Sequence, residues 1–314
     1  MKLARVLLDD RGHHVKALIA AAVLFALSAV VHAGDVGKPI PPAVISDPEP
    51  DPAHPPRSAE VLIPSHGMGM NGLFYLAGGA GPHPTMVLLH GFPGNEQNLD
   101  LAQAIRRAGW NVLTLHYRGS WGSPGLFSIA HVMEDADAAV EFVRRADIAQ
   151  QFGIDTGQIV LGGHSMGGLA SAAHARHDQR LQGVVLIDAW NAGATGDQMS
   201  AVPKSELRAA AEKRFNDIGN SLHGATALSM VEDTIAHRVD WNYQSWAADL
   251  THEPLLIVGA TRGRGEDNRK LAEAVTAAGG NVTAVMLESD HGFQDHRIAL
   301  AALVVDWLQR VAKR

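Results

Sequence analysis

The sequence predicts an α/β fold in which helices cover both faces of a mostly parallel, doubly wound sheet. Short apolar runs of strand length alternate with segments of helical periodicity along most of the 314-residue chain. The runs are apolar at successive positions, which is typical of strands that are buried on both faces. Strands are therefore predicted at 86–89, 112–115, 159–161, 184–187, 255–258 and 282–286, after an antiparallel edge at 61–63 and 73–76.

Between the strands, the pattern predicts helices near 99–108, 129–145, 168–175, 268–278 and 297–311. More than sixty residues separate the strand ending at Ile187 from the next strand at Leu255. This is too long for a plain crossover, so a helical cap insertion over the carboxyl edge of the sheet is predicted at 192–250. Five large side chains of the cap could face a substrate or simply be buried: Met199, Met230, Trp241, Tyr243 and Trp246.

The amino-terminal part is expected to lie outside this domain. Residues 1–33 have the features of a signal peptide, with basic residues outnumbering acidic ones before the uncharged segment 17–31. Cleavage after Ala33 would send the protein to the periplasm or beyond and leave no membrane span, because a span needs about 20 apolar residues; an uncleaved tether is the alternative. The proline-rich stretch 34–58 is predicted to be an extended linker or arm, and the catalytic domain to occupy 59–314.

Composition narrows the possible functions. The chain has no cysteine, so thiolate catalysis and cysteine metal sites are excluded. A net charge of −7 argues against nucleic acid as a partner. None of the 17 histidines falls in an HExxH pattern. His174 and His177 are one helical turn apart and could bind a metal, but a solvated helix face is the simpler interpretation. No metal and no cofactor is expected.

A serine surrounded by glycines indicates a nucleophile. Gly163-His164-Ser165-Met166-Gly167 follows a buried strand and precedes a helix, as in the G-x-S-x-G turn that presents a serine at the edge of a sheet. The backbone of such a turn is strained, so close neighbours must lack side chains. The following helix directs its amide groups towards the same point.

A base should follow the last strand, because a serine hydroxyl needs a group that removes its proton. His291, within Ser289-Asp290-His291-Gly292, is in that position. The near-neutral pKa of histidine suits a group that accepts a proton and then returns it. His296 is the competing candidate, but it falls at the start of the final helix.

Two backbone amides are expected to bind the oxyanion. One belongs to Met166, directly after the serine. The other should follow the strand at 86–89, where the chain reads His90-Gly91-Phe92-Pro93-Gly94, and Phe92 is the candidate donor. These groups together predict an acyl-transfer site.

From about Val61 to its end the chain resembles the α/β-hydrolase superfamily, since HGFPG, GHSMGG and SDHG occur in the order and spacing of that family. The segment 117–120, Tyr-Arg-Gly-Ser, resembles one found in prolyl-oligopeptidase-like and dienelactone-hydrolase-like members. The resemblance implies the α/β-hydrolase fold, a Ser–acid–His triad and hydrolysis without a metal.

The acid is where the chain departs from the family pattern. Members usually carry an aspartate just after the strand that corresponds to 255–258, but Thr261 and Arg262 stand there. Some members carry the acid at the end of the preceding strand, which is the position of Asp188. We expect Asp188 to be the acid, with Asp267 and then Glu266 as alternatives.

These features predict a serine hydrolase that cleaves small carboxylic esters through an acyl-enzyme. Two alternatives remain open: an exported serine peptidase acting on short peptides, and a catalytically poor binding module that keeps the fold.

Overall fold

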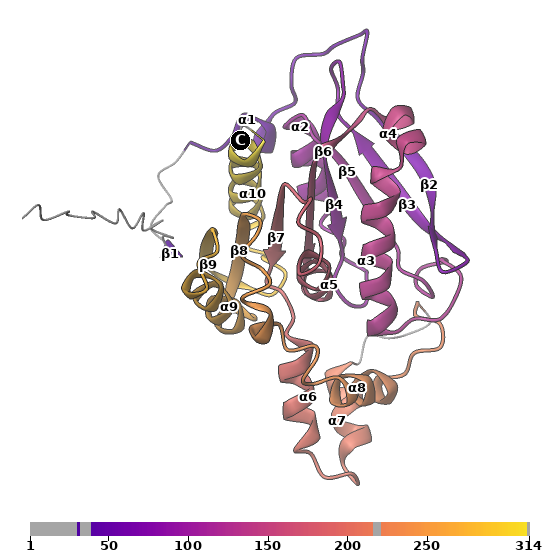
Figure 1. Ribbon diagram of the computed structural model, residues 1–314, viewed down its shortest axis with the longest axis vertical. Coiled ribbons are helices and arrows are strands. Elements are labelled where there is room, and N and C mark those ends of the chain that lie inside the picture. The colour runs from indigo at the N-terminus through magenta and orange to yellow at the C-terminus, as the bar shows by residue number, and fades with distance from the viewer. Residues whose placement is uncertain (1–29, 32–38, 216–220, 313–314) are drawn as a thin grey trace, which may run out of the picture.

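The computed structural model describes residues 30–31, 39–215 and 221–312 (Figure 1). Its nine-stranded sheet has the order β1-β9-β8-β7-β6-β4-β5-β3-β2. Strands β4 to β9 pair in parallel wherever they are neighbours, while β3 pairs antiparallel with both β2 and β5. The predicted fold class is therefore confirmed. The strands are β1 (Val30–Val31), β2 (Arg57–Ser65), β3 (Met68–Leu76), β4 (His83–Leu89), β5 (Asn111–Leu115), β6 (Ile154–His164), β7 (Gly183–Ile187), β8 (Leu255–Arg262) and β9 (Val282–Asp290).

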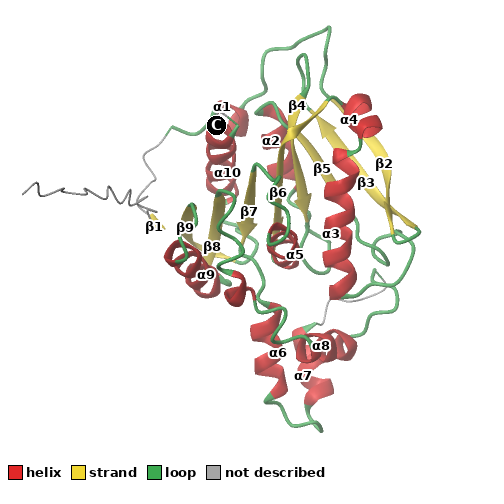
Figure 2. Ribbon diagram, in the orientation of Figure 1, coloured by secondary structure: helices red, strands yellow, loops and turns green. Residues whose placement is uncertain are grey.

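Helices cover both faces of the sheet (Figure 2). One core lies between the sheet and α3 (Ile129–Arg144), α4 (Ala146–Phe152), α5 (Met166–Ala175) and α9 (Gly265–Ala277). The second core lies between the opposite face and α2 (Leu99–Arg107) and α10 (Arg297–Val311). Successive strand residues alternate between the two: Val184 and Leu186 belong to the first core, Val185 and Ile187 to the second. This alternation explains why the strands are apolar at every position.

The segment between β7 and β8 is helical, as predicted. It contains α6 (Ala192–Ser200), α7 (Leu207–Arg214), α8 (Ala227–Ala236) and the 3₁₀ helix η1 (Tyr243–Trp246). Figure 1 shows α6, α7 and α8 projecting beyond the sheet at the edge where the parallel strands end. The five large side chains named for this segment are all buried, so they form its interior.

Backbone hydrogen bonds join this cap to the loop after β5. The amide of His223 donates to the carbonyl of Gly119 at 2.7 Å, and its carbonyl accepts from the amide of Phe127 at 2.9 Å. The amide of Trp121 donates to Ser221 at 3.0 Å. The cap is therefore fixed to the core at a second point, away from its chain connections.

The proline-rich stretch differs from the prediction of a wholly extended segment. Within it, the single-turn helix α1 (Pro42–Ile45) has proline in its first turn, where proline is tolerated because no amide is needed there. Arg107 donates to the carbonyls of Ala43 and Val44, and both of these side chains pack on the second core. This part of the arm is docked on the domain, and strand β2 already begins at Arg57.

Most of the predicted signal peptide, 1–33, lies outside the described residues. Its Val30 and Val31 form β1, which pairs in parallel with β9. None of the helices in the described ranges is long and apolar enough to span a membrane.

The expectation of a solvated position was wrong for His174, whereas His177 is exposed. His174 is buried near the end of α5, where Nδ1 lies 2.6 Å from Asp137 and Nε2 lies 2.9 Å from Asp178. These carboxylates raise the pKa of His174 against the opposing effect of burial. Across the described part of the chain, no group of three or more His, Asp or Glu side chains is arranged to hold a metal ion.

Candidate active site

Ser165 occupies a sharp turn between β6 and α5. Its φ and ψ angles are 55° and −113°, a conformation that a residue with a side chain rarely adopts. The turn is held by neighbouring backbone: the amide of Ser165 donates to Ile187 and its carbonyl accepts from Trp190, both at 2.9 Å. A Cβ on Gly167 would lie 2.3 Å from the carbonyl oxygen of Leu89, which explains why this position needs glycine.

Asp188 and His291 form a hydrogen-bonded pair at the same edge of the sheet. The Nδ1–H of His291 donates to Oδ2 of Asp188 at 2.6 Å. Asp188 is fully buried, whereas 38% of the His291 side chain is exposed. A fully buried carboxylate holding one side of a partly exposed imidazole fixes its orientation and leaves Nε2 for another group.

Backbone amides satisfy the rest of the Asp188 carboxylate. Oδ1 accepts from Ala260 at 2.8 Å and from Arg264 at 3.0 Å, and Oδ2 also accepts from Arg264 at 2.9 Å. Asp188 has a φ of 42°, so its backbone is strained at the end of β7. An amide near the end of β8 and one in the loop before α9 therefore hold this carboxylate in place.

The alternative acids do not contact His291. Glu266 pairs with Arg269 and Lys270 on its own helix, and the carbonyl of Asp267 accepts from Gln244. The competing histidine, His296, precedes α10 and lies 3.0 Å from Asp295. Of the candidates for acid and base, the structure brings together Asp188 and His291.

His164, to which the sequence analysis assigned no role, connects the serine turn to the loop that carries His291. Its Nε2–H donates to the carbonyl of His291 at 2.8 Å, and the centroids of the two rings are 4.5 Å apart. Burial, and then the nearby His291, lower the pKa of His164 to about 3, so its ring is neutral near pH 7. Since His164 directly precedes Ser165, this contact fixes the serine turn next to the loop that carries His291.

The loop after β4 lies directly on Ser165. A Cβ on Gly91 would be 3.0 Å from the Cβ of Ser165 and from Nδ1 of His164. The next residue is Phe92, while Met166 begins α5, where the first amides have no acceptor within the helix. The two predicted oxyanion donors thus belong to segments that meet at Ser165.

The segment Tyr117-Arg118-Gly119-Ser120 supports this loop. The hydroxyl of Tyr117 donates to the carbonyl of His90 at 2.9 Å, directly before Gly91. Burial lowers the pKa of His90 to about 4, so it is neutral near pH 7. Tyr117 is itself fully buried, which fixes the position of its hydroxyl.

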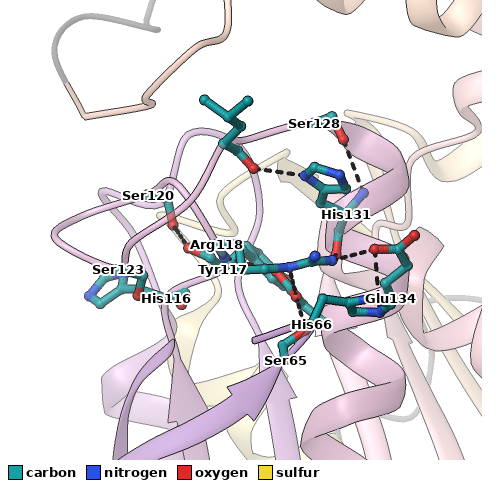
Figure 3. A network of polar contacts seen from close by, with 12 residues as sticks. Ser65, His66, His116, Tyr117, Arg118, Ser120, Ser123, Ser128, His131 and Glu134 are labelled. Atoms are coloured by element: carbon teal, nitrogen blue, oxygen red, sulfur yellow. Dashed lines mark hydrogen bonds and ion pairs between the residues drawn. The ribbon is translucent and has the colours of Figure 1, made fainter. Parts of the chain in front are cut away.

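Arg118 anchors the same segment to α3 (Figure 3). Its backbone amide donates to Asp135 at 2.8 Å and its Nε at 2.5 Å, while Nη2 pairs with Glu134. Asp135 is fully buried and also accepts from Ser65 at 2.6 Å. Both carboxylate oxygens of Asp135 thus accept hydrogen bonds. This buried ion pair fixes the start of the loop after β5, which carries Tyr117 and the residues that contact the cap.

Replacing Asp135 by alanine is expected to lower the free energy of unfolding by about 3 kcal/mol or more, because Arg118 would keep a buried charge without its main partner. Urea denaturation followed by circular dichroism measures this loss. Glu134→Ala is the matched control, since Glu134 pairs with the same arginine but is 42% exposed, and it should cost less than about 1 kcal/mol. Equal losses for both variants would contradict the account.

The order of the strands, the turn at Ser165 and the acid after β7 define the α/β-hydrolase class. The model of the alpha/beta hydrolase family matches residues 86–303, and the chain belongs to this family. The superfamily predicted from HGFPG, GHSMGG and SDHG is thereby confirmed.

Solved structures show the same fold. An esterase from Pyrobaculum calidifontis matches with a TM-score of 0.60 and 19% identity, over 82% of this chain and 85% of its own. EstE1, a thermophilic carboxylesterase cloned from a metagenomic library, matches with a TM-score of 0.59 and 18% identity, over 86% and 92%. No curated protein matches in sequence.

Proposed function

We propose that this protein is a serine hydrolase that cleaves carboxylic esters of small molecules through an acyl-enzyme intermediate. The observation that carries the proposal is the 2.6 Å hydrogen bond between His291 and the buried Asp188, at the sheet edge where Ser165 stands in a strained turn. The esterases with the same fold support the choice of esters.

Each group has a defined part in the proposed reaction. The Ser165 hydroxyl oxygen attacks the ester carbonyl while Nε2 of His291 takes its proton, and Asp188 stabilises the imidazolium. The tetrahedral oxyanion accepts hydrogen bonds from the amides of Phe92 and Met166. Cleavage of the ester C–O bond releases the alcohol, which receives its proton from His291.

Water completes the cycle. His291 removes a proton from a water molecule, whose oxygen attacks the acyl-enzyme carbonyl. The bond to Ser165 breaks, the serine oxygen takes the proton back from His291, and the carboxylic acid leaves.

Labelling with a fluorophosphonate tests the proposal. Ser165 should displace fluoride and add one phosphonyl group, located by peptide mass spectrometry, while Ser165→Ala should take no label and hydrolyse no nitrophenyl ester. Ser200→Ala, at the exposed end of α6, should react like the wild type. A folded wild-type protein that neither labels nor hydrolyses would overturn the proposal and favour a binding module. Faster cleavage of aminoacyl arylamides than of esters would instead indicate a peptidase.

The place of action is a further part of the proposal. The basic start and uncharged core of residues 1–33 support export of the enzyme to the periplasm or beyond.

A further inference from the structure

Arg264 places a partly exposed side chain with a guanidinium group beside the candidate site. It lies between β8 and α9, and its backbone amide is one of the donors to Asp188. Its Nε is buried and unpaired, and no carboxylate in the described part of the chain forms an ion pair with the side chain. Its guanidinium carbon lies 5.9 Å from the centroid of the Trp190 ring.

Asp188 attracts this charge without forming an ion pair with it. Both of its carboxylate oxygens are already engaged by His291 and by the amides of Ala260 and Arg264. A buried N–H donor without an acceptor costs free energy, so the Nε–H of Arg264 is expected to find a partner that binds from outside the described part of the chain.

A second arginine reaches the same region from the cap. Nη2 of Arg214, at the end of α7, donates to Oγ1 of Thr195 at 3.2 Å, and the same oxygen accepts from Nε1 of Trp190 at 2.7 Å. Burial, and then the charge of Arg214, lower the pKa of Arg264 to about 10. Arg264 is therefore still charged near pH 7, and two like charges lie around one indole ring.

This arginine pair borders the reacting groups. The backbone amide of Trp190 donates to the carbonyl of Ser165 at 2.9 Å. The ring centroid of Phe215, the residue after Arg214, lies 6.0 Å from that of Trp190 and 5.3 Å from that of Phe92. Both arginines are thus connected to the serine turn through Trp190, and Arg214 is also connected through Phe215 to Phe92 in the loop after β4.

We propose that Arg264, together with Arg214, binds a carboxylate carried by the substrate, so that the preferred esters are anionic. The inference rests on the proposed ester hydrolysis and adds the substrate class to it. A guanidinium presents paired donors that match the two oxygens of a carboxylate, and such charged bonds are stronger where water is excluded. The amino-terminal end of α9 adds positive potential at the same place.

Matched ester pairs provide the test. The 4-nitrophenyl monoester of adipic acid carries a free carboxylate in its acyl part. It is compared with the methyl 4-nitrophenyl diester, in which that carboxylate is methylated. For the alcohol part, 4-carboxyphenyl butyrate is compared with its methyl ester. The wild type should favour the charged member of at least one pair by about tenfold to hundredfold in kcat/KM, the range that one or two charge-assisted hydrogen bonds supply.

Variants assign the preference to Arg264. Arg264→Met should abolish the preference, because KM for the charged ester should rise about tenfold or more beyond any change for the neutral ester; Arg214→Met should reduce it. The control is Arg269→Met on the same helix, because Arg269 is paired with Glu266 and Glu273, and it should keep the preference. Equal loss on both esters would overturn the proposal, as would an unchanged preference in Arg264→Met.

Two further results separate the possible failures. A wild type that hydrolyses neutral esters but shows no charge preference refutes this inference and leaves the proposed function intact, whereas a wild type without any esterase activity or label refutes the proposed function itself. Thermal unfolding gives an independent measure: Arg264→Met should unfold at the same temperature as the wild type or above it, since an unpaired charge is removed. A clear fall would assign Arg264 a structural role on Trp190. Faster hydrolysis of 2-butyryloxyethyl phosphate, which carries a phosphate in its alcohol part, than of the carboxylate esters would show that the arginines select phosphate instead and would also overturn the proposal.

Discussion

Replacing Asp188 by asparagine is expected to lower kcat by about 10⁴-fold with little change in KM. An asparagine oxygen can still accept from the amides of Ala260 and Arg264, but its NH₂ group would face Nδ1 of His291. The imidazole would then accept at Nδ1 and carry its proton on Nε2, so it could not take a proton from Ser165. Initial rates on a nitrophenyl ester, with active-site titration, measure the effect.

Asp267→Asn is the matched control, because Asp267 was the second candidate for the acid and its known contact is made by its backbone carbonyl. This variant should retain activity within about threefold. If Asp267→Asn were the impaired variant and Asp188→Asn the active one, the assignment of the acid would be wrong. If both were active, the imidazole would not need a carboxylate, and the proposed mechanism would lose its central contact.

The fold could be predicted because its determinants are local. The strands are apolar at every position since each contributes alternate residues to two cores, as Val184 and Val185 do. The long insertion between β7 and β8 was visible as an interruption of the strand and helix rhythm. The short helix α1 was not, because one turn beginning at Pro42 has no periodicity and depends on docking through Arg107.

The serine and histidine stand in local motifs, whereas the acid was chosen among three carboxylates. Asp188, Glu266 and Asp267 all follow strands that end at one edge of the sheet, and only the place of Asp188 directly at the end of its strand favoured it. The difference arises because the chain enters α9 at Gly265, which places Glu266 and Asp267 in the first turn of a helix. Asp188, in contrast, has a strained φ and accepts hydrogen bonds from the amides of Ala260, near the end of β8, and Arg264, directly before α9.

The residues missed from the sequence act through contacts between distant segments. His164 contacts His291, and Arg264 contacts Trp190, across separations that no local pattern encodes. The sequence did single out Tyr117 and Arg118, because they resemble a segment found in family members. In the structure, the hydroxyl of Tyr117 donates to the carbonyl of His90, and Arg118 pairs with a carboxylate on α3.

Replacing His291 by glutamine is expected to reduce kcat by about 10⁵- to 10⁶-fold, because the proton acceptor for Ser165 would be lost while the amides at Phe92 and Met166 would remain. The same variant should lose its reactivity with a fluorophosphonate, since an unactivated hydroxyl is a poor nucleophile. Ester hydrolysis and labelling rates are measured side by side, after circular dichroism has shown that the variant is folded.

His296→Gln is the control for this experiment, since His296 is five residues further on, is similarly exposed and also lies beside a carboxylate, that of Asp295. It should hydrolyse esters at the wild-type rate. A strong loss in His296→Gln with a mild one in His291→Gln would exchange their assignments, and the hydrogen bond from His291 to Asp188 would then be structural. Because Asp188→Asn and His291→Gln remove two ends of one hydrogen bond, combining them should cost little more than His291→Gln alone. Additive losses in that double variant would mean that the two residues act separately.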